Sequence, residues 1–277
     1  MEYNKVLIDN SKIAYFRRGD RRKPKILFIH GLLSSSSYFN STINFIKDDF
    51  DILSVDLPGY GLSEKMKGKK HNVKNFAIYI RKLCDELRFK GFSLVGGSLG
   101  GMVSIQFTLM FQQYVKKLVV QGTPWLKDSI RHPFIDYLYF YIVRHKKVFN
   151  MFKKFRDNVT RENFENMLKI FSRNYYYNYN KSDGVIYYFF KSMNLGLQKE
   201  VWERMEHLDF TKEIKKLKKP TLILLGKKDT HVKLGDAKKL AGVLEDAKLK
   251  VFKNGSHTLF LDYPEKLAKI LKDFLYD

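Results

Sequence analysis

The stretch FSLVGGSLGG, residues 92–101, decides the fold of this 277-residue chain. Its first four residues are an apolar run typical of a buried strand, and a helix is predicted from Leu99 to Phe111. Between them, Gly96-Gly97-Ser98-Leu99-Gly100 has the pattern Gly-X-Ser-X-Gly. A sharp strand-to-helix turn needs small residues, and it pushes the serine Oγ out of the sheet. The stretch therefore predicts a nucleophilic serine, the alternative being a glycine-rich turn with an incidental serine.

Strands and helices alternate on both sides of this turn. The apolar runs lack the alternation of a half-exposed strand, which indicates strands buried on both faces and hence a mostly parallel sheet of the α/β class. Strands are expected at residues 6–8, 13–16, 26–29, 52–55, 92–95, 118–120, 221–225 and 249–252, and further helices at 73–87, 236–244 and 264–275.

The alternation stops after Pro124 and resumes near Pro220. The intervening region contains 21 of the 42 aromatic residues of the chain and no clear strand. Helices are expected there at residues 134–149, 161–171 and 185–192. We therefore expect a core made of residues 1–124 and 211–277, with residues 125–210 inserted into it as a separate helical unit.

A serine hydroxyl is a weak nucleophile and needs a base, which in turn needs an orienting carboxylate. His257 follows the last expected strand, and Asp229 follows the strand at 221–225. The carboxyl ends of parallel strands lie at one edge of a sheet, where ligands bind. Ser98, Asp229 and His257 are thus the expected catalytic residues. Asp56, which follows the strand at 52–55, is the main rival acid and is expected instead to shape a loop.

The other histidines considered have no expected catalytic role. His30 ends an inner strand and is expected to be structural. Surface positions are expected for the remaining ones: His71, His132, His145 and His207.

Several motifs together resemble the α/β-hydrolase family over nearly the whole chain. They are His30-Gly31, residues 56–63 (DLPGYGLS), the turn at residues 96–101, residues 226–229 (GKKD), and residues 255–257 (GSH) with 262–265 (DYPE). The resemblance implies an eight-stranded sheet with a helical cap, or lid, after the sixth strand. It also implies an oxyanion hole formed by the backbone N–H groups of Leu32 and Leu99. Gly97 stands where many members have a larger residue.

The resemblance implies a serine esterase or lipase that needs no metal and no organic cofactor. The expected substrate is a carboxylic ester with a small to medium apolar or aromatic acyl group, held by the aromatic insertion. The candidate pocket residues are Trp125, Tyr137, Tyr141, Tyr187 and Trp202. Most aromatic side chains of the insertion are expected to form its own core instead.

Other functions are compatible with the same residues. A carbon–carbon bond hydrolase of the ring-cleavage type has a similar triad and cap. An esterase acting on an acyl carrier protein would use the basic charge to attract an acidic carrier. Acyl transfer and perhydrolysis use the same triad. A small-molecule receptor with slow turnover is the alternative outside enzymes.

The amino-acid composition of the chain limits the partners and the cellular location that we expect for the protein. The net charge is +22, but 39 of the 51 basic residues are lysine, a weaker choice than arginine for bidentate phosphate recognition. No nucleic-acid-reading motif accompanies the charge, so a nucleic-acid partner is not expected. The single cysteine excludes an internal disulfide. No signal peptide and no apolar run of about 18 residues is found, so the expectation is a cytoplasmic monomer or homodimer without a transmembrane segment.

Overall fold

The computed structural model describes residues 2–127, 129–130, 145–163, 166, 195–205 and 207–276. Within these residues, eight strands form one sheet in the order β1-β2-β4-β3-β5-β6-β7-β8. The strands are β1 (Asn4–Ile8), β2 (Ser11–Arg18), β3 (Lys25–Ile29), β4 (Asp51–Val55), β5 (Phe92–Gly97), β6 (Val115–Gln121), β7 (Thr221–Gly226) and β8 (Ala247–Phe252). Strand β2 pairs antiparallel with β1 and β4, and all other pairings are parallel. The prediction of a mostly parallel α/β sheet is confirmed.

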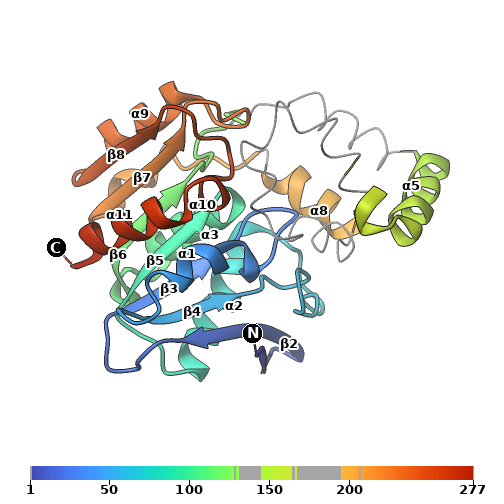
Figure 1. The fold of residues 1–277 in the computed structure, drawn as a ribbon, viewed down its shortest axis with the longest axis horizontal. Coiled ribbons are helices and arrows are strands. Elements are labelled where there is room, and N and C mark those ends of the chain that lie inside the picture. Colours follow the sequence, from blue (N-terminus) through green and yellow to red (C-terminus); the bar gives the residue numbers. More distant parts are fainter. Residues whose placement is uncertain are drawn as a thin grey trace.

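Helices cover both faces of this sheet (Figure 1). One face carries α1 (Asn40–Asn44), α10 (Leu259–Asp262) and α11 (Pro264–Tyr276). The other carries α2 (Val73–Glu86), α3 (Leu99–Met110) and α9 (Leu234–Val243). Short 3-10 helices are η1 (Ser36–Phe39), η2 (Gln112–Tyr114) and η4 (Ile214–Lys216).

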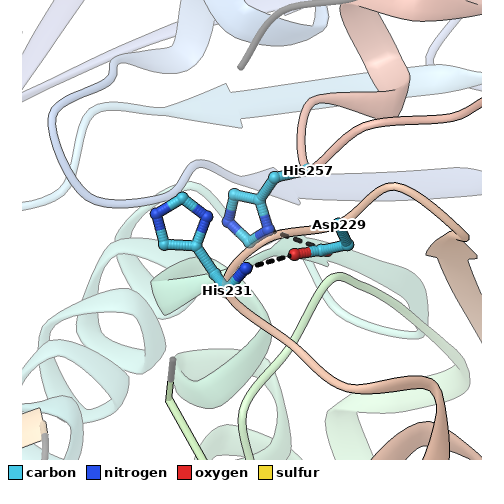
Figure 2. A group of neighbouring side chains, drawn as sticks. All are labelled: Asp229, His231 and His257. Carbon is cyan, nitrogen blue, oxygen red and sulfur yellow. Dashed lines mark hydrogen bonds and ion pairs between the residues drawn. The ribbon is translucent and has the colours of Figure 1, made fainter. Parts of the chain in front are cut away.

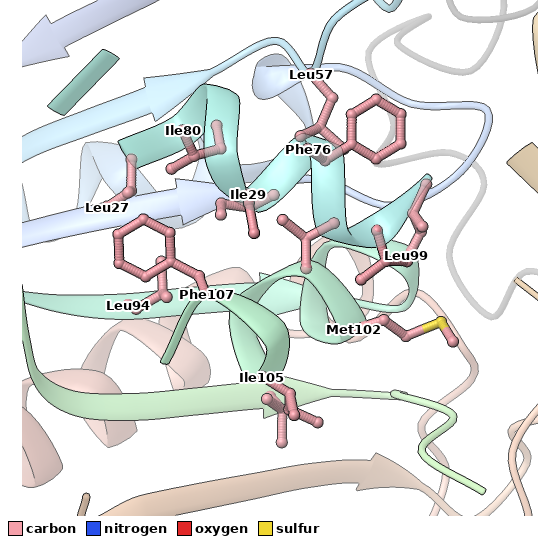
Figure 3. Packing of buried hydrophobic residues seen from close by; sticks show 14 of the residues in the cluster. Leu27, Ile29, Leu57, Phe76, Ile80, Leu94, Leu99, Met102, Ile105 and Phe107 are labelled. Atoms are coloured by element: carbon pink, nitrogen blue, oxygen red, sulfur yellow. The ribbon is translucent and has the colours of Figure 1, made fainter. Parts of the chain in front are cut away.

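Strand β3 shows why the apolar runs have no polar alternation. Leu27 and Ile29 point into the hydrophobic cluster under α2 and α3, part of which is drawn in Figure 3. Ile26 and Phe28, between them in sequence, point into the cluster under α1 and α11. Successive side chains of a strand point to opposite faces, so a sheet covered on both sides needs apolar residues at every position.

The region after β6 is an insertion whose two ends lie side by side. The backbone N–H of Phe210 donates to the carbonyl of Trp125 at 3.0 Å. The described helices between them are α5 (Lys146–Asn158) and α8 (Leu195–Met205). Most of the predicted helix at 134–149 lies outside the described residues, and its last residues fall in α5, which begins at Lys146 and continues to Asn158. The predicted helices at 161–171 and 185–192 lie almost wholly outside the described residues. The domain boundaries at 125 and 210 stay a prediction.

Candidate active site

Ser98 lies in a strained turn between β5 and α3. Its φ is +53° and its ψ is −119°, a conformation that non-glycine residues rarely adopt. The glycines around it are required by close packing. A Cβ on Gly96 would lie 2.4 Å from the carbonyl oxygen of Gly100, and one on Gly100 would lie 2.0 Å from that of Ile29. The Gly-X-Ser-X-Gly stretch thus forms a tight strand-to-helix turn with Ser98 at its tip.

Asp229 and His257 form a hydrogen-bonded pair at the carboxyl ends of β7 and β8. The Nδ1 of His257 lies 2.9 Å from Oδ2 of Asp229, and the carboxylate is buried (Figure 2). The other oxygen, Oδ1, accepts the backbone N–H groups of His231 and Val232 at 2.8 and 2.9 Å. Burial acts to raise the pKa of Asp229, but His257 and the two backbone donors together hold it below its ordinary value. Asp229 is therefore an ionised acceptor at neutral pH, suited to orient an imidazole.

The loop that carries His257 is held by a second buried carboxylate. Oδ2 of Asp262 accepts hydrogen bonds from the backbone N–H of Ser256 at 2.8 Å and from the Ser256 hydroxyl at 2.7 Å. Burial raises the pKa of Asp262, and the two donors from Ser256 oppose that effect. This contact gives the DYPE segment a structural purpose, because it fixes the turn just before His257.

The end of β6 connects the serine turn to the histidine loop. The carbonyl of Gln121 accepts the backbone N–H of Ser98 at 2.8 Å, and its Nε2 donates to the carbonyl of His257 at 2.8 Å. The next residue, Gly122, has a φ of +52°, and a Cβ there would lie 3.0 Å from both Asp229 Oδ2 and His257 Nδ1. The sequence assigns no role to Gln121, whose contacts with the two loops appear only in the tertiary structure.

The backbone after β3 also passes beside the serine turn. A Cβ on Gly31 would lie 3.2 Å from the Cβ of Ser98. Leu32 follows directly, and Leu99 is the first residue of α3. Both backbone segments assigned to the oxyanion hole are therefore next to Ser98, and that role stays a prediction.

The rival acid Asp56 is engaged elsewhere. Its Oδ1 accepts hydrogen bonds from the backbone N–H and from the hydroxyl of Ser36, both at 2.7 Å. Its Oδ2 accepts one from the backbone N–H of Leu62 at 2.8 Å. His30 is fully buried, and its Nε2 accepts the N–H of Leu57 at 3.0 Å. Burial lowers the pKa of His30, outweighing the nearby Asp56 charge. Both side chains hold loops in place, as the sequence predicts.

Replacing Asp56 by Asn is expected to destabilise the fold by about 1–3 kcal/mol. An amide NH₂ would face a backbone N–H at one of the two oxygen positions, which leaves a buried donor unsatisfied. Thermal unfolding should show the loss, while the folded fraction keeps its specific activity. A stable but inactive D56N protein would contradict this assignment and point to Asp56 as the catalytic acid.

His231 is a neighbour of His257 for which sequence reasoning had no role. The two imidazole rings lie side by side, with centroids 4.4 Å apart and planes inclined by 38° (Figure 2). Among the described residues, Asp229, His231 and His257 form a group that could hold a metal ion. Each offers one ligand atom, and these atoms lie within 4.8 Å of one another. Both Asp229 oxygens already accept hydrogen bonds, so a metal ion there would disrupt the Asp229–His257 pair. The sequence feature that could have indicated His231 as a neighbour of this pair is its position, two residues after Asp229.

His71 corrects an expectation, because it is buried rather than at the surface. Its Nε2 accepts the N–H of Met66 at 3.0 Å, and its Nδ1 lies 3.2 Å from Glu200 on α8. The other Glu200 oxygen accepts the backbone N–H of His71 at 2.9 Å. Burial lowers the pKa of His71, although Glu200 acts to raise it. The pair joins the loop before α2 to the insertion.

Two of the five candidate pocket residues are among the residues that the structure describes. Trp125 and Trp202 are both buried in the large hydrophobic cluster, and the Trp125 indole N–H donates to the carbonyl of Asp236 at 2.8 Å. This is the environment expected of core residues. Tyr137, Tyr141 and Tyr187 lie outside the described residues. A cavity of about 630 Å³ lies between α2, α3 and α8, and Ser98, Asp229 and His257 are not among its lining residues.

A strained serine after a parallel strand, with an Asp–His pair at the same sheet edge, defines the class of α/β hydrolases. Residues 24–264 match the family model described as the alpha/beta hydrolase fold, so the chain belongs to this family. The resemblance inferred from the motifs is confirmed.

Known proteins with overall similarity include two curated relatives and a solved structure. The uncharacterised hydrolase YugF of Bacillus subtilis is 26% identical over 97% of this chain and 96% of its own. Monoacylglycerol lipase abhd6-B of Xenopus laevis is 23% identical over 96% of this chain and 80% of its own. The structure of a thermophilic esterase from Thermogutta terrifontis shares the fold with a TM-score of 0.78 at 18% identity, over 100% of this chain and 98% of that one.

Among the described residues, every helix is too short or too polar to cross a bilayer.

Proposed function

We propose that this protein is a serine hydrolase that cleaves carboxylic esters through an acyl-enzyme on Ser98. The observation that carries the proposal is the arrangement at one sheet edge. Ser98 is held in a strained turn, Asp229 is bonded to His257, and Gln121 is hydrogen-bonded to both the serine turn and the histidine loop. Such a constellation supplies a nucleophile, a base and an orienting group.

The reaction follows from these roles. His257 Nε2 takes the proton of the Ser98 Oγ while the oxygen attacks the ester carbonyl. The N–H groups of Leu32 and Leu99 stabilise the oxyanion, and each such donor is typically worth ~10²–10³ in rate. His257 then returns the proton to the leaving alcohol, which leaves the acyl group on Ser98. Water, deprotonated by His257, hydrolyses that ester and regenerates the serine.

Substrate class is proposed from the insertion and the relatives. The aromatic-rich residues 125–210 would act as a cap whose surface selects an apolar or aromatic acyl group. The similarity to a monoacylglycerol lipase over most of the chain supports an ester as substrate. An apolar group entering such a pocket would contribute binding in proportion to the area removed from water.

Turnover of p-nitrophenyl esters from acetyl to palmitoyl tests the proposal. We expect hydrolysis that depends on Ser98, that has an optimum chain length, and that changes little between low and moderate salt, because the substrate is neutral. Ser98→Ala should be inactive. Ser104→Ala is the matched control, since Ser104 lies on α3 and donates only to the Gly100 carbonyl in the hydrogen bonds described.

Folded protein that hydrolysed none of these esters would contradict the proposed reaction. Cleavage of a carbon–carbon bond substrate would then be measured next. Activity only on a carrier-bound ester, falling steeply with salt, would indicate an acidic carrier protein as partner. Ligand binding with no steady turnover would indicate a receptor.

A further inference from the structure

Helix α5 (Lys146–Asn158) has apolar side chains exposed to solvent. Met151 is 67% exposed and Phe155 is 42% exposed, whereas large apolar residues of the core are almost fully covered. The helix lies at the end of the molecule remote from β8 and the carboxyl terminus (Figure 1). Nothing in the proposed reaction requires this exposed surface.

The apolar residues of α5 share one face of the helix. Val148, Met151, Phe152 and Phe155 have the i, i+3, i+4, i+7 spacing that places side chains in one stripe. An amphipathic surface helix normally buries such a stripe against the protein, but here Met151 and Phe155 are exposed and Val148 and Phe152 are only half-buried.

Basic side chains flank this apolar stripe. The helix carries five basic residues and one acidic residue, Asp157. Arg156 bonds Asp157 through Nε and an Nη atom at 2.9 and 2.7 Å. Lys147 and Lys154 lie at i−4 and i+3 from Met151, along one border of the stripe, and both are exposed. An apolar stripe bordered by lysines is the pattern of a helix that lies in the plane of a lipid interface.

We infer that α5 binds an anionic lipid surface, with Met151 and Phe155 inserted at the boundary between headgroups and acyl chains and the lysines over the phosphates. Charge complementarity favours this occupant, since α5 is strongly basic and the whole chain carries +22. Lysine suits a diffuse anionic surface, because its ammonium group acts as a point charge without a fixed fork geometry. The inference does not depend on the proposed ester chemistry.

Co-sedimentation of the full chain with vesicles tests the inference. We expect weak binding to phosphatidylcholine vesicles, and binding stronger by about tenfold or more when phosphatidylglycerol is included, with a loss at high salt. The variant Met151→Gln/Phe155→Gln should bind anionic vesicles about tenfold more weakly. Lys147→Gln/Lys154→Gln should weaken binding by a similar factor.

Matched controls separate this helix from the general charge of the protein. Leu7→Gln removes an apolar side chain that is 60% exposed on the edge strand β1. Lys248→Gln/Lys250→Gln removes two exposed charges from β8. Both controls should bind vesicles like the unmodified protein. Equal losses in the α5 variants and the controls, or no loss in the α5 variants, would overturn the inference.

Two further readouts keep the result independent of folding and of catalysis. Phe155→Trp should place a new indole in the bilayer, where brominated lipids quench its fluorescence, and an absence of quenching would overturn the inference. Turnover of soluble p-nitrophenyl acetate by the unmodified protein tests the esterase proposal without vesicles, so a failed vesicle result is distinct from a failed esterase proposal. If the α5 variants instead abolished a dimer and still bound vesicles, the apolar face would be a contact between two copies and the inference would be wrong.

Discussion

Ser98→Ala, His257→Ala and the double variant are each expected to lower kcat by a similar factor, about 10⁴–10⁶. The reason is that serine and histidine act as one unit, so removing the second partner of an already broken pair costs little more. Steady-state kinetics on a p-nitrophenyl ester, at matched concentrations of folded protein, measures the three losses. KM should change much less than kcat.

The structure offers a control of the same residue type for each change. His207 is exposed and far from β8 in sequence, so His207→Ala should be nearly as active as the unmodified protein. Ser104→Ala should likewise keep its activity. Losses that multiply in the double variant would mean that Ser98 and His257 act independently, and the proposed mechanism would be wrong.

Asp229→Asn is expected to lower kcat by about 10⁴ while the protein stays folded. The two backbone N–H donors on Oδ1, from His231 and Val232, would hold the amide oxygen of the new side chain. The amide NH₂ would then occupy the Oδ2 position and donate to His257 Nδ1. This hydrogen bond selects the imidazole tautomer with a proton on Nε2, which is unable to accept the proton of Ser98.

Circular dichroism and a pH–rate profile of the D229N variant check this prediction. Restored activity at high pH would agree with a tautomer effect, since hydroxide in solution can replace the base. Asp56→Asn is the isosteric comparison and should lose stability rather than turnover. Near-normal turnover of D229N would show that another group orients His257.

Secondary structure was predictable wherever the signal is local. The helix expected at residues 73–87 is α2 (Val73–Glu86), because apolar residues repeat at helical spacing and Asn72 caps the first turn through a hydrogen bond to the N–H of Asn75. The serine turn was predictable for the same reason, since the glycines that permit it lie within three residues of Ser98. In the aromatic-rich insertion the predicted helix end at Phe149 was wrong, since α5 extends nine residues further, to Asn158.

Contacts between segments that are distant in the sequence could not be predicted from local patterns. The pair of His71 and Glu200 spans 129 residues, and no periodicity relates the two positions. Gln121 and His231 are likewise ordinary residues in their own segments. They acquire a role only because parallel strands bring their ends to one sheet edge.

The sequence by itself determined the class of fold, and it indicated Ser98 and His257 together with two rival acids, Asp229 and Asp56, of which it favoured Asp229, because side-chain periodicity and glycine turns act over a few neighbouring residues. Only the tertiary structure decided which acid serves His257. In the strand order, β7 and β8 are adjacent, so Asp229 lies beside His257. Strand β4, which Asp56 follows, lies five strands from β8, a separation of about 24 Å at ~4.8 Å per strand. Strand order results from how the crossovers pack over the whole sheet, and local sequence carries no measure of it.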